Sequence, residues 1–187
     1  MHTGGFACSR EDAAIGAAVE RLGITYPVVC DGELQIWDAY GNAGWPARYL
    51  WDRELALYSL HYGEGAYAET EREIQALLGT GGDVVPLVRP EDAPDVLLPP
   101  QTEDQRGLYA GPYEAGGVHL VCEGSGTLRA DGGPEVAVDG CGVYTVLEHP
   151  HHTAGVLDVR AGGDVAVLQT CFTPGLPAPG ASGPPAA

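Results

Sequence analysis

The sequence contains no lysine, and its positive charge is sparse. All 9 basic residues are arginine, against 26 Asp and Glu, which gives a formal net charge of −17 over 187 residues. A surface this acidic repels nucleic-acid phosphates and anionic lipids. We therefore expect neither nucleic acid nor a membrane surface among the partners of the chain.

Long apolar runs are also absent. No stretch approaches the roughly 20 apolar residues needed to cross a bilayer. The first part of the chain lacks the basic start and apolar core of a targeting peptide. The sequence therefore predicts a cytoplasmic protein with no membrane insertion.

The sequence lacks a Cys-x-x-Cys pair. Its cysteines are odd in number and widely spaced, so we expect no disulfide framework and predict that most of them are small buried hydrophobes. They are Cys8, Cys30, Cys122, Cys141 and Cys171. Hydrophobic residues make up 44% of the chain, which is enough for a packed core.

Composition divides the chain into four zones. Residues 1–79 mix helical and strand patterns, and residues 80–106 are rich in Pro and Asp, which is typical of a linker or wrapping arm. Residues 107–173 alternate apolar and polar positions in short runs separated by Gly-rich turns, as in a sandwich or jelly roll. Residues 174–187 contain only a few residue types, mainly Pro, Gly and Ala, and are expected to be disordered.

The first zone predicts a definite order of elements. A helix should begin at Ser9, whose spacing to Asp12 fits a capping box, and should end at Gly23. The elements expected after it are a short strand over 24–29, a helix over 33–40, strands over 47–51 and 55–62 that form a hairpin, and a helix over 67–78.

Several motifs in this order resemble the thioredoxin-like domain of DipZ-type and related redoxin proteins. They are His2–Thr3 as the end of a strand, Ile24–Asp31, Ile36–Trp37, Tyr40–Asn42, Gly44–Leu50 and His61–Tyr67. The third zone more loosely resembles the β-rich domain that follows the redoxin domain in the same proteins, at Val156–Asp158 and Thr170–Pro174. The resemblance implies an N-terminally truncated α/β thioredoxin-like fold, followed by a small all-β sandwich or jelly-roll-like segment.

The resemblance also implies where substrate would bind. The matching proline of the family is cis and faces the Cys-x-x-Cys, so Trp45 and Pro46 are expected to shape the groove for an extended substrate. Protein disulfides or a redox partner are the implied partners, and no cofactor is implied. Because the pattern begins after the family's Cys-x-x-Cys, we expect a truncated or mis-started chain that is inactive as written.

Two readings of function follow. The first is a thiol–disulfide oxidoreductase whose reacting thiol pair is not encoded here, and the alternative is a non-catalytic binding or assembly module derived from a redoxin. Cys8 is a candidate reactive thiol because it stands at the predicted start of a helix, and its alternative is a structural role. His149–His152 is the densest metal-like cluster, but its spacing matches no zinc motif, so we expect a solvated turn and no metal site.

Overall fold

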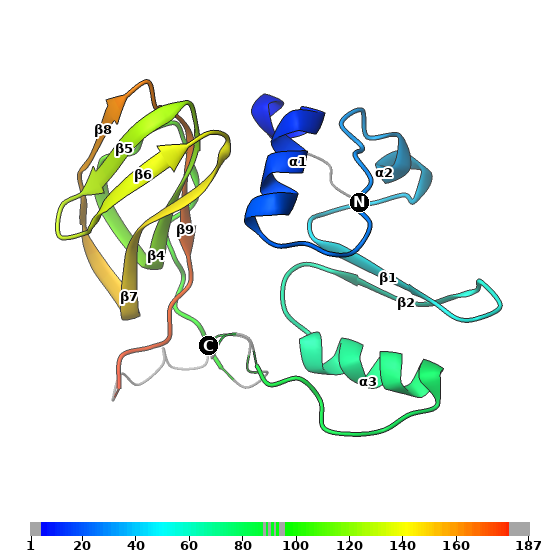
Figure 1. The fold of residues 1–187 in the computed structure, drawn as a ribbon. Helices are drawn as coiled ribbons and strands as arrows, with labels where there is room; N and C mark the ends of the chain where they lie inside the picture. The colour runs from blue at the N-terminus through cyan, green and yellow to red at the C-terminus, as the bar shows by residue number, and fades with distance from the viewer. Residues whose placement is uncertain (1–4, 88, 90, 92, 94–95, 180–187) are drawn as a thin grey trace. The chain divides into compact units, whose positions relative to one another are not determined.

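The structure, a computed structural model, describes residues 5–87, 89, 91, 93 and 96–179 (Figure 1). The chain divides into two compact units, one formed by Met1–Leu34 with Leu97–Ala187 and the other by Gln35–Val96. This division differs from the predicted boundary at residue 79, because a disulfide joins Cys8 to Cys141 and groups the start of the chain with the β-rich region. The strand end expected at His2–Thr3 lies outside the described residues.

The start of the first unit is helical, but not as predicted. A 3-10 helix, η1, spans Ala7–Arg10, and α1 spans Asp12–Arg21. The Ser9 hydroxyl donates to the Phe6 carbonyl (2.9 Å) and accepts from the Phe6 amide (3.3 Å). Ser9 therefore closes the turn of η1, and the predicted capping box at the start of α1 is wrong, because Glu11 holds that N-cap position.

The strand predicted over 24–29 is also absent from the described elements. These residues adopt irregular structure, with only an isolated bridge at Cys30. Pro27 has no N–H to give to a strand ladder, which explains why an apolar run here does not become a strand.

The β-rich region forms two sheets, with strand orders β3-β9-β4-β7 and β6-β5-β8 (Figure 1). Neighbouring strands are antiparallel throughout, and β4 is the strand that pairs with both β7 and β9. The strands are β3 Gln105–Arg106, β4 Gly111–Glu123, β5 Ser125–Ala130, β6 Glu135–Asp139, β7 Gly142–Leu157, β8 Val159–Gly163 and β9 Ala166–Thr173.

Alternation along the strands builds one hydrophobic core between these sheets. On β4, Val118, Leu120 and Cys122 are fully buried, as their shared face predicted. Leu128 of β5 and Phe172 of β9 pack into the same cluster. Strands β4 to β9 therefore each contribute apolar side chains to a common interior.

Segments on both sides of the β-rich region pack onto it. The Thr102 amide donates to the Glu114 carbonyl (2.8 Å), so the end of the predicted linker belongs to this unit. At the other end Gly175 is buried, and the His152 amide donates to the Leu176 carbonyl (2.7 Å). The predicted disordered tail therefore does not begin at residue 174, because backbone hydrogen bonding orders its first residues, while residues 180–187 lie outside the description.

The second unit contains the hairpin and helix predicted from the sequence. Its elements are α2 Gln35–Ala39, β1 Ala47–Trp51, β2 Leu57–Tyr62 and α3 Tyr67–Leu78. The strands pair antiparallel, with Arg48 opposite His61. Gly79 ends α3 in the left-handed conformation (φ 66°), which glycine adopts without strain.

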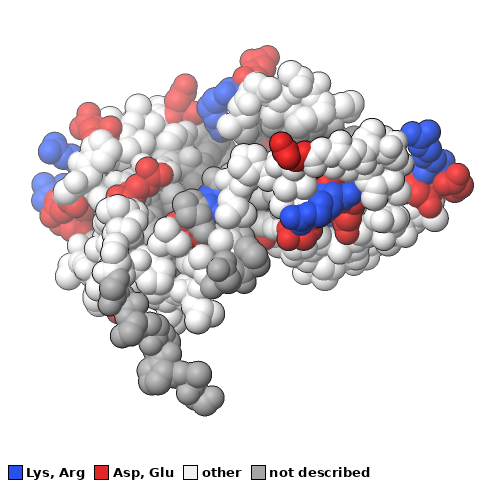
Figure 2. Space-filling view, turned by 90° about the horizontal axis from the view of Figure 1, so that it is seen from below, with Lys and Arg blue, Asp and Glu red and all other residues white. Residues whose placement is uncertain are grey.

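The charged side chains of the surface include both the Asp and Glu residues that dominate the composition and the few Arg residues (Figure 2). On the face that Figure 2 shows, Arg side chains lie beside Asp and Glu side chains in several groups, and uncharged surface separates these groups. Within the described residues, no helix has the length and apolar character needed to span a membrane.

Candidate functional site

Trp45 and Pro46 lie immediately before β1, in the Gln35–Val96 unit. The peptide bond between them is cis. The Pro46 carbonyl accepts a hydrogen bond from the Gly63 amide (2.8 Å), so the start of β1 is tied to the residue that follows β2. The hairpin therefore fixes the backbone on which both predicted groove residues stand.

The Trp45 side chain forms an exposed aromatic platform. Its ring stacks on Trp37 of α2, with centroids 4.3 Å apart and the planes tilted by 31°. Even so, 59% of Trp45 remains exposed. An aromatic ring that is held from one side and open on the other can cover apolar parts of a bound polypeptide.

Arg48 braces the turn after β2. Its guanidinium donates to the Gly65 carbonyl (2.6 Å) and lies 5.2 Å from the centre of the Tyr67 ring. Tyr67 in turn donates to Glu64, and this bond is the first cause of the raised Tyr67 pKa. The conformation of the Gly63–Glu64–Gly65 turn therefore depends on a side chain from the opposite strand, which the sequence motif did not reveal.

A tyrosine cluster occupies the other face of the hairpin. The Tyr49 hydroxyl lies 3.2 Å from that of Tyr62 and donates to Asn42 Oδ1 (3.0 Å). This hydrogen bond to Tyr62, with partial desolvation, raises the pKa of Tyr49 to about 12. Tyr49 therefore stays protonated at neutral pH, and its ring makes an edge contact with Tyr40 (centroids 5.0 Å apart).

The hairpin offers free strand edges. Within the described residues, β1 and β2 form a sheet of only these two strands. An unpaired edge presents backbone N–H and C=O groups to which an extended peptide can add as a further strand. Trp45 and Pro46 stand at the beginning of such an edge.

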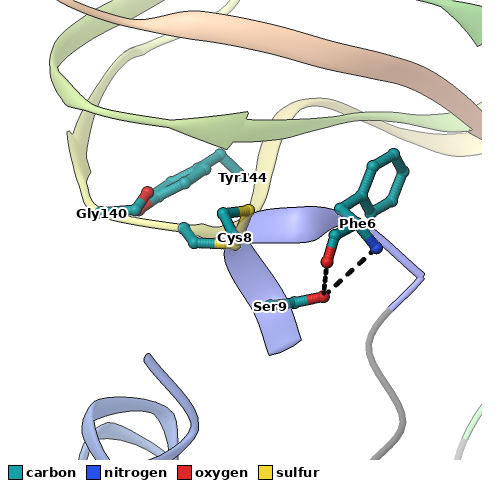
Figure 3. The surroundings of a disulfide bond; sticks show 6 residues. Phe6, Cys8, Ser9, Gly140 and Tyr144 are labelled. Atoms are coloured by element: carbon teal, nitrogen blue, oxygen red, sulfur yellow. Dashed lines mark hydrogen bonds between the residues drawn. A yellow bond between two sulfur atoms is a disulfide. The ribbon is translucent and has the colours of Figure 1, made fainter. Parts of the chain in front are cut away.

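The reactive chemistry expected of a redoxin is not in this unit. All five cysteines lie outside residues 35–96. Cys8, the candidate reactive thiol, is bonded to Cys141 over a sequence separation of 133 residues, so it is not a free nucleophile in this structure (Figure 3). The sequence predicted no disulfide framework and gave no sign of this single bond, because the fold unites residues whose spacing gives no signal.

The three free thiols are poor nucleophiles. Burial raises the pKa of Cys122 and of Cys171 to about 11, with the carboxylate of Asp104 contributing at Cys171. At exposed Cys30, desolvation first and then the Asp12 carboxylate also raise the pKa. Because the thiolate is the attacking form, none of the three is activated at neutral pH.

The histidine cluster is built into a strand irregularity. Residues 149–152 of β7 stand opposite the single residue Gly116 of β4, since Ala115 pairs with Thr153 and Gly117 with Glu148. His149 Nε2 lies 2.8 Å from the Tyr113 hydroxyl, and His152 Nε2 lies 3.4 Å from a Glu114 carboxylate oxygen.

His149 and His152 therefore each have a protein partner at Nε2, whereas Nδ1 of His151 and Nδ1 of His152 are buried without a hydrogen bond. Within the described part of the chain, no group of three or more His, Cys, Asp or Glu side chains is placed to hold a metal ion. The predicted solvated turn is wrong, because residues 149–152 lie within strand β7 and form the irregularity opposite Gly116.

The chain is similar over part of its length to two curated proteins. No protein-family model matches the chain. Over 111 residues it is 31% identical to the protein DipZ of Mycobacterium bovis and to the protein DipZ of Mycobacterium tuberculosis. The matched region covers 59% of this chain but only 16% of each DipZ sequence. The chain is therefore similar to a small part of DipZ.

Proposed function

We propose that this chain is part of a thiol–disulfide exchange protein with a thioredoxin-like fold, and that Trp45 and Pro46 shape its groove for an extended, disulfide-containing polypeptide. The observation that carries the proposal is the exposed Trp45 ring, held by Trp37 at the start of an unpaired strand edge. The partial similarity to DipZ and the order of motifs around the Trp-Pro pair support the same reading.

In this exchange the chain binds the substrate polypeptide and does not supply the attacking thiol. Its five cysteines include no Cys-x-x-Cys pair. The free thiols have raised pKa values, whereas exchange requires a thiolate to attack a disulfide sulfur and form a mixed disulfide. The reacting dithiol is therefore assigned to a redox partner or to a part of the protein outside this sequence.

A peptide-binding measurement tests the groove. The probe is an extended peptide whose single cysteine carries a small thiol as a mixed disulfide, and binding is measured by calorimetry. Trp45→Ala should weaken binding about tenfold, as for a central aromatic anchor. Trp51→Ala is the matched control, since Trp51 is also exposed (43%) but ends β1 instead of preceding it. Equal loss in both variants would contradict a groove at Trp45.

The open strand edges favour one alternative, a non-catalytic binding or assembly module. Such a module would recruit a strand through backbone hydrogen bonds and would not depend on cysteine in the peptide. The same peptide with serine in place of cysteine separates the two functions. Loss of binding supports the exchange protein, and unchanged binding supports the assembly module.

An insulin-reduction assay with dithiothreitol provides a second comparison. Neither function predicts that this chain alone accelerates the reaction. Acceleration that disappears in Cys8→Ser would instead make Cys8 the reacting thiol and would contradict the binding role proposed here.

A further inference from the structure

The Cys8–Cys141 disulfide joins the two parts of the first unit that line an apolar groove. The groove has a volume of about 530 Å³. One wall comes from the start of the chain, including Phe6, Ile15 and Leu22, and the other comes from the outer side of the β-rich region, including Val121 and Val143. The disulfide therefore lies where the N-terminal segment, here defined as residues 5–34, meets β4 and β7.

The N-terminal segment covers the outer side of the sheet only in part, since Val143, which pairs with Val121, is 67% exposed. On β4, Leu120 and Cys122 point into the core, so Val121 between them points outward. A side chain on an outer face is normally exposed, yet only 7% of Val121 is exposed. The residues that line the groove around it belong to the N-terminal segment and to β7, so removal of the segment would expose this apolar surface.

Each cysteine stands in a turn that has its own local support (Figure 3). On one side, Ser9 closes η1 by bonding to Phe6. On the other, the Tyr144 hydroxyl donates to the Gly140 carbonyl (3.1 Å) and accepts from the Asp139 amide (3.1 Å), which fixes the turn before β7. These bonds do not involve sulfur, so both turns can persist when the disulfide is broken.

The bond is also accessible. Cys8 and Cys141 are both only partly buried. A Cβ placed on Gly140, the residue before Cys141, would have no other atom within 4 Å. An incoming thiol therefore has room to approach the disulfide from this side. The Cα atoms of the two cysteines are 5.9 Å apart, within the range that a disulfide spans without backbone movement.

We propose that Cys8–Cys141 is a reversible thiol–disulfide exchange site that latches the N-terminal segment to the outer side of β4 and β7, with a dithiol as its reductant. A reductant thiolate attacks one sulfur of the pair, breaks the Cys8–Cys141 bond and forms a mixed disulfide. The second reductant thiolate then displaces the remaining cysteine. The reductant leaves as its own disulfide, and Cys8 and Cys141, reduced by two electrons, each take up a proton. This site is independent of the groove proposed at Trp45.

Thiol counting tests whether the bond forms. The air-oxidised full chain, denatured before labelling, should present three reactive thiols, those of Cys30, Cys122 and Cys171. After treatment with dithiothreitol it should present all five. Five thiols in the oxidised protein would overturn the proposal.

Limited trypsin digestion tests the latch itself. Because the chain has no lysine, trypsin cleaves only after arginine. Arg10 and Arg21 report on the N-terminal segment, while Arg129 and Arg160 report on strands β5 and β8. Reduction should raise cleavage at Arg10 and Arg21 about tenfold, because a released segment opens locally. Cleavage at the two strand sites should stay slow, and reoxidation should restore the protection.

Single substitutions complete the test. Cys8→Ser and Cys141→Ser should each be cleaved rapidly at Arg10 and Arg21 with or without dithiothreitol. Cys30→Ser is the matched control from the same segment and should keep the redox dependence. The wild-type comparison requires no substitution, so it remains decisive if a variant folds poorly. Equal cleavage of the oxidised and reduced wild-type protein would overturn the latch.

Discussion

The β-rich region and the Gln35–Val96 unit are stabilised in different ways. In the β-rich region, Leu120, Leu128 and Leu157 are at most 1% exposed and belong to one continuous hydrophobic cluster. In the described part of Gln35–Val96, only Gly65 is buried. Ring contacts and polar bonds hold that unit instead, such as the bond from the Ser59 hydroxyl to Glu73 (2.6 Å). A substitution in the β-rich region therefore removes buried packing, whereas one in the Gln35–Val96 unit removes surface ring contacts or hydrogen bonds.

The difference shows why each unit suits its proposed role. A packed core gives a region high local stability, whereas few buried contacts give low local stability and mobility. The β-rich region can therefore serve as the fixed base on which the disulfide closes. The hairpin unit can adjust its exposed aromatic side chains and its strand edge to a bound polypeptide.

The largest expected effect comes from truncating the β-rich core. Leu120→Ala should lower the unfolding free energy by about 2–5 kcal/mol, the usual cost of an internal cavity at a buried leucine. Urea unfolding followed by far-UV circular dichroism measures it, since most strands belong to this region.

Leu60→Ala in β2 provides the matched control, because Leu60 is 42% exposed. It should cost about 0.5 kcal/mol or less. Tryptophan fluorescence follows this unit alone, since Trp37, Trp45 and Trp51 all lie within it. If Leu120→Ala shifted the fluorescence and circular dichroism transitions equally, the two units would unfold as one, and the comparison would fail.

Replacing a glycine in each unit compares how tightly the two backbones are packed. At Gly116 a Cβ would lie 2.5 Å from Gly175 Cα and 2.8 Å from Gly175 N, with the Pro174 carbonyl closer still. Gly116→Ala should therefore lower stability by about 1–3 kcal/mol, because the backbone must shift. Gly44→Ala in the hairpin unit meets no atom within 4 Å and should change little. Chemical unfolding of both variants, followed by the two probes above, measures the difference.

Local patterns predicted the hairpin unit well. The Gly-Trp-Pro motif, the apolar strands and the turn residues of 44–79 act over short distances, so the sequence predicted β1, β2 and α3 near their observed bounds. Alternation at Val118, Leu120 and Cys122 similarly predicted the buried face of β4.

Contacts between distant residues were not predictable in this way. The Cys8–Cys141 bond unites positions 133 residues apart, and neither cysteine has a neighbour that signals pairing. Arg48 also meets Gly65 only because β1 and β2 align in one register. Such features require the fold before the residues can be recognised.

The smallest expected effect is a pH dependence confined to the β-rich region. His119 is held between the Thr145 hydroxyl (2.9 Å) and the Thr173 hydroxyl (3.1 Å). Burial lowers its pKa below 6.5, although the carboxylates of Glu148 and Asp104 act in the opposite direction. Between the folded pKa and 6.5 the unfolded chain binds more protons at this residue than the folded chain does. The His119 contribution is therefore complete above pH 6.5 and is lost as the pH falls through the folded pKa.

His119→Gln isolates that contribution, because an amide can still hydrogen-bond but does not titrate in this range. The variant should show a smaller fall in the urea midpoint of the circular dichroism transition as the pH is lowered below 6.5. His61→Gln in β2 is the matched control and should leave the pH dependence of that transition unchanged. An identical pH profile in wild type and His119→Gln would show that His119 does not link protonation to folding of the β-rich region.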